Sequence, residues 1–114
     1  MSLTAFITNL SEQADSIEFA DTMAIIEDNY TFTPTAFTNG ETQSDAGQNN
    51  GSCKIFAFGL LNNLSEQQTL ACFGTYYRDD VLGNPDGDDH QNIRQFMISG
   101  WTKVQFDGEA LAKE

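Results

Sequence analysis

Two segments near the N-terminus carry apolar residues at helical spacing. The first set follows the i, i+3, i+4, i+7 pattern of one helix face: Leu3, Phe6, Ile7 and Leu10. The second set repeats at the same period in a segment whose outer face is acidic: Phe19, Met23, Ile26 and Tyr30. We therefore predict a short helix around residues 3–10 and a second helix over about 15–29, with Asp15 or Ser16 as the N-cap of the second.

The helical period stops in residues 30–51, which are rich in Thr, Asn and Gly. Apolar and polar residues alternate at the start of this stretch, Pro34 excludes a helix interior, and Asn39-Gly40 is a strong tight-turn signal. We predict a short strand or extended segment here, because the stretch is otherwise a longer loop than most. Long ordered loops in small domains often carry function.

A strongly apolar helical block begins at Ser52. Its apolar residues lie on all sides of the helix rather than on one stripe: Ile55, Phe56, Phe58, Leu60 and Leu61. Such a helix is buried on most sides, so we predict that it lies at the centre of the core. Ser52 is the predicted cap, Cys53 and Lys54 fill the first turn, and Gly59 indicates close packing against a neighbour.

Two further helices follow the central one. Ser65 and Gln68 fit a capping box that opens the first of them. Its apolar face is formed by Leu70, Phe73 and Tyr77. The turn residues 84–87 break the chain, and the last helix ends near Gly100.

The segment 101–109 alternates again and turns at Asp107-Gly108. The fold class we predict is therefore mainly α: a compact bundle of about five helices, with a small two-stranded β element in which residues 30–38 pair with residues 102–108. The 114 residues suit a single domain spanning 1–114, and we expect a monomer.

Charge narrows the range of partners. The chain has 17 acidic and 5 basic residues, a net charge of -12, and its first basic residue is Lys54. Nucleic acids and anionic membranes are bound through Lys and Arg, so this composition argues against both. The sequence also has no run of 18 apolar residues and no Sec-type signal peptide. A cation, a basic protein or a neutral small molecule is compatible with it, although acids also serve simply to keep a small protein soluble.

The segment NPDGDDHQNIR, residues 84–94, is the sharpest cluster of metal-ligand types. Asn84, Asp86 and Asp88 match the first ligand positions of an EF-hand loop, but Asp89 replaces its glycine and the final glutamate is missing. One hypothesis is a looser divalent-cation site formed by Asp86, Asp88 and Asp89. The other is a helix start, where acids favour the N-terminal dipole. We favour the helix start and expect no cofactor.

The two cysteines also have two interpretations. A nucleophilic Cys53 would need His90 as its base, with Asp89 or Asn92 orienting the imidazole. The helix dipole and the neighbouring lysine would then lower the pKa of the thiol. The alternative is that Cys53 and Cys72 are both reduced and buried, as free cysteines often are. Zinc is not indicated, because the cysteines and the histidine lack ligand-pair spacing.

A site is expected where three segments converge: the 41–51 loop, the start of the Ser52 helix and the 86–94 turn. Polar residues beside apolar walls are the usual composition of a pocket. The candidate residues are Asn49, Asn50, Cys53, Lys54, Tyr77, Arg78, Asp89, His90 and Arg94. A phosphate loop is not indicated, since the G-x4-G-K-[ST] spacing is not met and the net charge opposes an anion.

Five stretches together resemble one known family. They are NYTFTPTAFTNG (29–40), AGQNNGSCKIFAF (46–58), LSEQQTLACFGTYYRDDVL (64–82), DDHQNIRQFM (88–97) and SGWTKVQFDGEAL (99–111). In this order they are similar to the HopJ type III effector family, also called HopPmaJ, over about residues 16–111. The family name supplies no reaction, so no catalytic residue is carried over from it.

The resemblance implies a protein made in the bacterial cytoplasm and delivered into a host cell by type III secretion. Its partners would be the secretion machinery and a host protein. Residues 1–11 carry no charged side chain, which suits an export signal and a core helix equally. Two other functions fit the residues: a cytosolic small-molecule or metal-binding domain, and a Cys-dependent enzyme using Cys53 and His90. Binding is favoured over catalysis.

Overall fold

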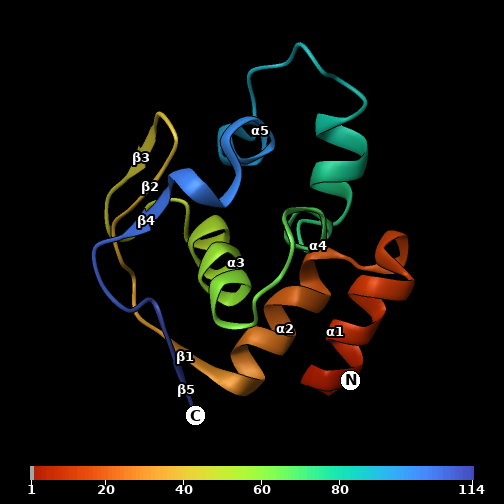
Figure 1. The fold of residues 1–114 in the computed structure, drawn as a ribbon, viewed down its shortest axis with the longest axis vertical. Coiled ribbons are helices and arrows are strands. Elements are labelled where there is room, and N and C mark those ends of the chain that lie inside the picture. Colours follow the sequence, from red (N-terminus) through yellow and green to blue (C-terminus); the bar gives the residue numbers. More distant parts are fainter. Residues whose placement is uncertain (1) are drawn as a thin grey trace.

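The computed structural model describes residues 2–114, which form a mainly α-helical domain with two small antiparallel sheets. Figure 1 shows α3 at the centre, with α1, α2 and α4 on one side and strands β2, β3 and β4 on the other. The predicted mainly α class is confirmed. In chain order the elements are α1 (Leu3–Glu12), η1 (Ala14–Ser16), α2 (Phe19–Asn29), β1 (Tyr30–Phe32), β2 (Phe37–Asn39), β3 (Thr42–Ser44), α3 (Asn50–Leu61), α4 (Glu66–Ala71), the π-helix η2 (Tyr76–Val81), α5 (Gln91–Ser99), η3 (Gly100–Lys103), β4 (Val104–Phe106) and β5 (Leu111–Lys113).

Helix α2 begins later than predicted, because its N-cap is Glu18 rather than Asp15 or Ser16. The Glu18 N–H donates to the Asp21 carboxylate (3.1 Å) as part of a capping box. The residues before it form the short helix η1 instead, which places Ile17 in extended backbone and buries its side chain. Burial of this one apolar residue is the physical reason for the interruption.

Helix α3 is the centre of the core, as predicted from its uniform apolar pattern. Its interior residues are almost fully buried: Cys53, Ile55, Phe56, Ala57, Phe58 and Gly59. A methyl group at Gly59 would lie 2.7 Å from the Trp101 ring, so the predicted close packing at this glycine is confirmed. The predicted cap at Ser52 is wrong: the helix begins at Asn50, and the Cys53 N–H donates to the carbonyl of Asn49 (2.9 Å).

A cluster of aromatic rings fixes α3 against its neighbours. The Phe56 ring contacts four others, from β2, the end of α4, α5 and η3, with centroid separations from 5.0 to 6.3 Å: Phe37, Phe73, Phe96 and Trp101. Tilted and edge-to-face arrangements of this kind add to the energy of burial. The cluster therefore joins the helical side of the molecule to its strands.

The β structure is larger than the predicted two-stranded element. The expected pairing of the 30–38 and 102–108 segments is seen between residues 37–39 and 104–106, and in its register Phe37 lies opposite Phe106. However, a turn at Gly40 (φ +59°) adds β3 to this sheet, and β1 pairs separately with β5. Pro34 lies between β1 and β2, where its missing N–H breaks the expected continuous strand in two.

In the second half of the chain, one predicted helix start is confirmed, and one predicted helix is divided in two. Ser65 and Gln68 form the predicted capping box, with the Gln68 N–H donating to Ser65 Oγ (3.0 Å). The predicted apolar face is buried, but the helix is divided at Gly74 (φ +61°), where a Cβ would lie 2.6 Å from the backbone nitrogen of Phe19. Gly100 ends α5, as predicted. Within residues 2–114, no helix has the length and apolar character needed to cross a membrane.

Candidate functional site

A cleft lies where the starts of α3 and α5 face one another. Its volume is about 540 Å³, inside the rough range of 300–1,000 Å³ typical of small-molecule sites. The 41–51 loop, the start of the central helix and the 86–94 turn all contribute to it, so the three segments converge as expected. The lining residues are Phe19, Thr42, Asn49, Gly51, Ser52, Phe73, Tyr76, His90, Gln91, Asn92 and Ile93.

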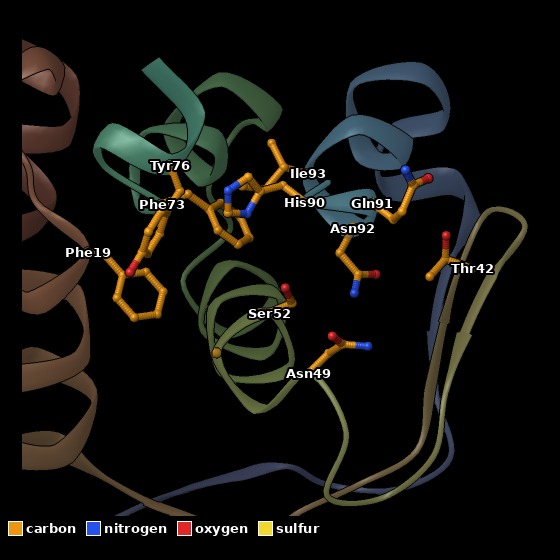
Figure 2. A pocket seen from close by; sticks show the side chains of 11 residues that line it. Phe19, Thr42, Asn49, Ser52, Phe73, Tyr76, His90, Gln91, Asn92 and Ile93 are labelled. Atoms are coloured by element: carbon orange, nitrogen blue, oxygen red, sulfur yellow. The ribbon is translucent and has the colours of Figure 1, made fainter. Parts of the chain in front are cut away.

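One wall of the cleft is aromatic. The rings of Phe19 and Tyr76 meet edge to face with centroids 5.2 Å apart, and the Tyr76 ring lies 5.3 Å from the His90 imidazole at an angle of 34°. Figure 2 shows these three rings, with Phe73, on the same side of the cavity. This wall offers flat apolar surface against which a ligand ring can stack.

The opposite wall is made of amide and hydroxyl side chains. In Figure 2 they face the rings across the cavity: Thr42, Asn49, Ser52, Gln91 and Asn92. Asn49 is held in place by its Nδ2, which donates to Ser44 Oγ (2.9 Å). Although the chain has 17 acidic residues, no Asp, Glu, Lys or Arg is found among the described residues that line the cleft.

Asn92 is the most buried polar residue of this wall, with 6% of its surface exposed. Asn39 Nδ2 donates to the main-chain carbonyl of Asn92 (2.8 Å) and to Asn92 Oδ1 (3.2 Å). A main-chain carbonyl only accepts, so this pair fixes the orientation of both amides. Asn92 Nδ2 then has no acceptor within residues 2–114, and Asn39 Oδ1 is a fully buried atom with no partner there. A buried polar group left unpaired costs about 1–3 kcal/mol.

The two helices that face the cleft begin in the same unusual way. Their N-cap residues, Asn49 and His90, both have left-handed backbone, with φ of 52° and 49°. In the described part of the chain, neither helix has a side-chain cap or an acidic residue in its first turn. The first N–H groups of a helix carry the positive end of its dipole, so both starts present donors to the cleft.

His90 is oriented by a carboxylate outside the cleft. Its Nε2 lies 3.1 Å from Asp80 Oδ2 and 4.0 Å from Asp89 Oδ2. Asp80 therefore occupies the orienting position that we predicted for Asp89 or Asn92. The imidazole is partly exposed and packs at a tilt against the Tyr76 ring.

The acidic turn is organised around a guanidinium group. Arg94 Nη2 lies 2.6 Å from Asp89 Oδ1, and Arg94 Nη1 donates to the carbonyl of Asn84 (2.8 Å). The hydrogen bond from Arg94 lowers the pKa of the Asp89 carboxyl. Asp86 and Asp88 are exposed, and no group of three His, Cys, Asp or Glu side chains in residues 2–114 is placed to hold a metal ion. The acidic residues thus lie just before α5, whose first turn holds no acid, and Asp89 is paired with Arg94.

Cys53 and His90 lie in different environments: His90 lines the cleft, and Cys53 is in the core. Its side chain is 1% exposed and does not line the cleft, and its Sγ donates to the carbonyl of Thr35 (3.5 Å). Burial raises the pKa of the Cys53 thiol, and the nearby Lys54 offsets only part of that rise. The Lys54 ammonium itself lies 4.9 Å above the Phe32 ring. These are the properties of a core cysteine rather than of an activated nucleophile.

The remaining candidates lie outside the cleft. Tyr77 is buried and its hydroxyl accepts from Gln67 Nε2 (3.2 Å). Arg78 lies 3.2 Å from the Glu18 carboxylate, on the surface of the molecule. Asn50 is exposed in the first turn of α3. Of the nine predicted site residues, the cleft brings together Asn49 and His90.

Sequence reasoning missed most of the aromatic wall. Helical spacing places Phe19 on an apolar helix face, and nothing in the local pattern around Phe19 or Tyr76 indicates a cavity. Ser52 was interpreted as a cap, and Gly51 as part of a turn. The available signal was compositional: an amide and glycine stretch before α3 that exceeds what a helix start requires.

Comparisons with known proteins identify a family and a similar solved structure for this chain. The sequence profile of the HopJ type III effector protein family matches residues 3–111. The crystal structure of VPA0580, a protein of unknown function, is 60% identical in sequence, with a TM-score of 0.98 over 100% of this chain and 95% of that one. No curated protein matches the chain. The chain therefore belongs to the HopJ type III effector protein family.

Proposed function

We propose that this chain acts as a binding protein, and that the cleft between α3 and α5 receives a small ligand with a flat ring. The observation that carries the proposal is the division of the cleft into an aromatic wall and an amide and hydroxyl wall. Pockets that combine apolar surface with a few fixed polar groups are the common form of small-molecule sites. A ligand ring lies against Tyr76 and His90, while its polar edge faces Ser52 and Asn92.

Binding is favoured over cysteine chemistry by the placement of the thiol. Cys53 is buried behind the first turn of α3, and the raised pKa of its thiol keeps it protonated at neutral pH. Ligand binding needs neither a nucleophile nor a metal from the cleft. It needs shape, a stacking surface and hydrogen bonds, which the lining residues supply.

A ligand screen by ¹H–¹⁵N NMR tests the proposal. We expect ring-containing ligands to shift the amide resonances of Gly51, Ser52 and Asn92, and Tyr76→Ala to weaken that binding at least tenfold. Leu82→Ala is the matched control, because Tyr76 and Leu82 are similarly exposed, at 42% and 49%, and Leu82 lies outside the cleft. Ligands whose shifts map to other surfaces, or binding that Tyr76→Ala leaves unchanged, would refute the proposal.

We also propose that the protein reaches its ligand or target inside a host cell by type III secretion. The family match supports this, as does the lack of charged side chains in residues 1–11. The N-terminal segment also has a structural role, because Phe6 and Leu10 of α1 are buried in the core. An export signal in these residues therefore has to leave the core before it is recognised.

A translocation reporter fused to residues 1–50 tests the secretion proposal. We expect delivery from a strain with an active type III system and none from a matched strain whose system is disabled. Equal reporter signal from both strains, or no signal from either, would contradict delivery by this route and leave the binding proposal untouched.

A further inference from the structure

We infer that the ligand of the cleft carries an oxyanion, a phosphate or a carboxylate, seated between the starts of α3 and α5. This inference rests on the proposed function, since it assumes that the cleft is the binding site. It adds the chemical class of the group that the amide and hydroxyl wall receives, and it names Asn92 as a donor to that group.

The first observation is the free donor on Asn92. The contacts from Asn39 fix Asn92 Oδ1 toward β2, and Asn92 Nδ2 has no acceptor in residues 2–114. Figure 2 shows the Asn92 side chain directed from α5 toward Ser52 and Asn49, across the floor of the cleft. Asn92 as a residue is 6% exposed and its side chain is aimed into the cavity, where a ligand oxygen supplies an acceptor for Nδ2.

The second observation is the pair of helix starts. Helix α3 has 12 residues and α5 has 9, so each has a full dipole whose positive end faces the cleft. Backbone N–H groups at such a start bind anions directly. Gly51 lets a ligand approach the start of α3 closely, because a Cβ at this position would itself lie 2.9 Å from the Phe19 ring and narrow the cavity.

The other helices do not share this arrangement. Ser2 caps α1, and a capping box closes α4. At α2 the Asp21 carboxylate lies in the first turn and accepts from the N–H of the N-cap residue Glu18 (3.1 Å). A side chain that occupies these donors leaves them unavailable to a ligand. The cleft is therefore where two long helices keep their first donors free and where Asn92 adds a third.

The net charge of -12 does not determine the electrostatic field inside the cleft. Charges more than about 8–10 Å apart across water are largely screened at physiological salt. The described lining of the cleft contains no carboxylate, and the carboxylates of Asp80 and Asp89 interact with His90 and Arg94, respectively. Neutral donors and helix dipoles thus face the cavity, and they favour an oxyanion over a cation.

Isothermal titration of the full chain with three single-ring probes tests the inference: phenyl phosphate, benzoate and benzyl alcohol. We expect at least one oxyanion probe to bind at least tenfold more tightly than benzyl alcohol, and the tighter of the two oxyanion probes identifies phosphate or carboxylate.

Asn92→Asp preserves the acceptor for Asn39 and replaces the free donor with a carboxylate oxygen, so it should weaken binding of the oxyanion probe at least tenfold. Gln105→Glu, on an exposed residue of β4 outside the cleft lining, makes the same charge change and should alter affinity less than twofold.

Ser52→Asp is a second variant in case Asn92→Asp perturbs the fold, and it should weaken the oxyanion by a similar factor. The inference is overturned if benzyl alcohol binds the native chain as tightly as both oxyanions, or if folded Asn92→Asp and Ser52→Asp retain native affinity. Tight binding of benzyl alcohol in the cleft would support the proposed binding function and refute only the inference that the ligand carries an oxyanion. If none of the three probes binds, the oxyanion is likewise excluded, and the wider ligand screen decides the binding function separately.

Discussion

The starts of α3 and α4 solve the same physical problem in opposite ways. At α4, Ser65 and Gln68 close the first N–H groups with a reciprocal pair of side-chain bonds. At α3, Asn49 adopts left-handed backbone and no described side chain caps the helix. A closed start stabilises the helix by itself, whereas an open start depends on packing elsewhere and leaves its donors free. The difference indicates that the open starts serve the cleft.

The largest expected effect concerns what holds the open start of α3 in place. Phe56 is fully buried and contacts four aromatic rings, so Phe56→Ala should lower the free energy of unfolding by about 3–5 kcal/mol. Urea denaturation followed by circular dichroism measures this loss. Leu61→Ala, at a side chain that is 52% exposed on the same helix, is the control and should cost under about 1 kcal/mol. Similar losses for the two variants would mean that core packing does not hold α3.

The next largest effect is a pH dependence of stability that arises from Cys72, which lies at a helix end and not at a helix start. Cys53 lies near the open start of α3, and Cys72 is at the end of α4, where burial raises the pKa of its thiol to about 12. The unfolded chain loses this proton near pH 9 and the folded chain keeps it until about pH 12, so stability should fall across this window. The expected slope from this group is about 1.4 kcal/mol per pH unit.

Denaturation of the native chain and of Cys72→Ala at several pH values isolates that slope. The variant removes the titrating thiol, so the difference in stability between the two proteins should shrink as the pH rises from 9 toward 12. A constant difference across this range would mean that the Cys72 thiol titrates at its ordinary pKa in the folded protein.

A smaller effect compares the two helix starts directly. Ser65→Ala removes a side-chain cap from α4 and should cost about 1 kcal/mol. Ser52→Ala removes a hydroxyl that makes no cap and should change stability by less than about 0.5 kcal/mol. Urea denaturation of both variants measures the contrast, and equal losses would show that Ser52 does cap α3.

The smallest effect adds what the open start lacks. Ser52→Asp places a carboxylate in the first turn of α3, which should raise the free energy of unfolding by about 0.3–1 kcal/mol at low salt. The gain should disappear at high salt, because the dipole interaction is screened. A loss of stability at low salt would mean that the field at this helix start is not positive.

The sequence predicts the capped helix start and the buried core of this molecule better than it predicts the starts of α2 and α3. The capping box at Ser65, the buried pattern of α3 and the pairing of the 30–38 segment with 102–108 were all predicted from the sequence, and the structure bears them out. The starts of α2 and α3 differ from the prediction, because the N-cap of α2 is Glu18, an unusual residue type there, and the side chain of Asn49 bonds Ser44 instead of capping α3. Tertiary contacts decide those two boundaries.

The location of the cleft was predictable, but its lining was not. The converging segments are visible as turn-rich composition beside apolar blocks, and they contain Asn49 and His90, which line the cleft. Phe19 and Tyr76 reach the cleft from helices far away in the chain, and the split at Gly74 that positions Tyr76 depends on its contact with the backbone of α2. No local pattern encodes a contact of that kind.

One NMR titration compares an open and a closed helix start within a single sample. The native chain is titrated with phenyl phosphate, and the backbone amide shifts of Gly51 and Ser52 in α3 are measured against those of residues 66–68 in α4. We expect saturable shifts at α3 and at the Asn92 side-chain amide, with little change at α4. Equal shifts at the two helix starts, or none at α3, would contradict the account that the open starts form an oxyanion site.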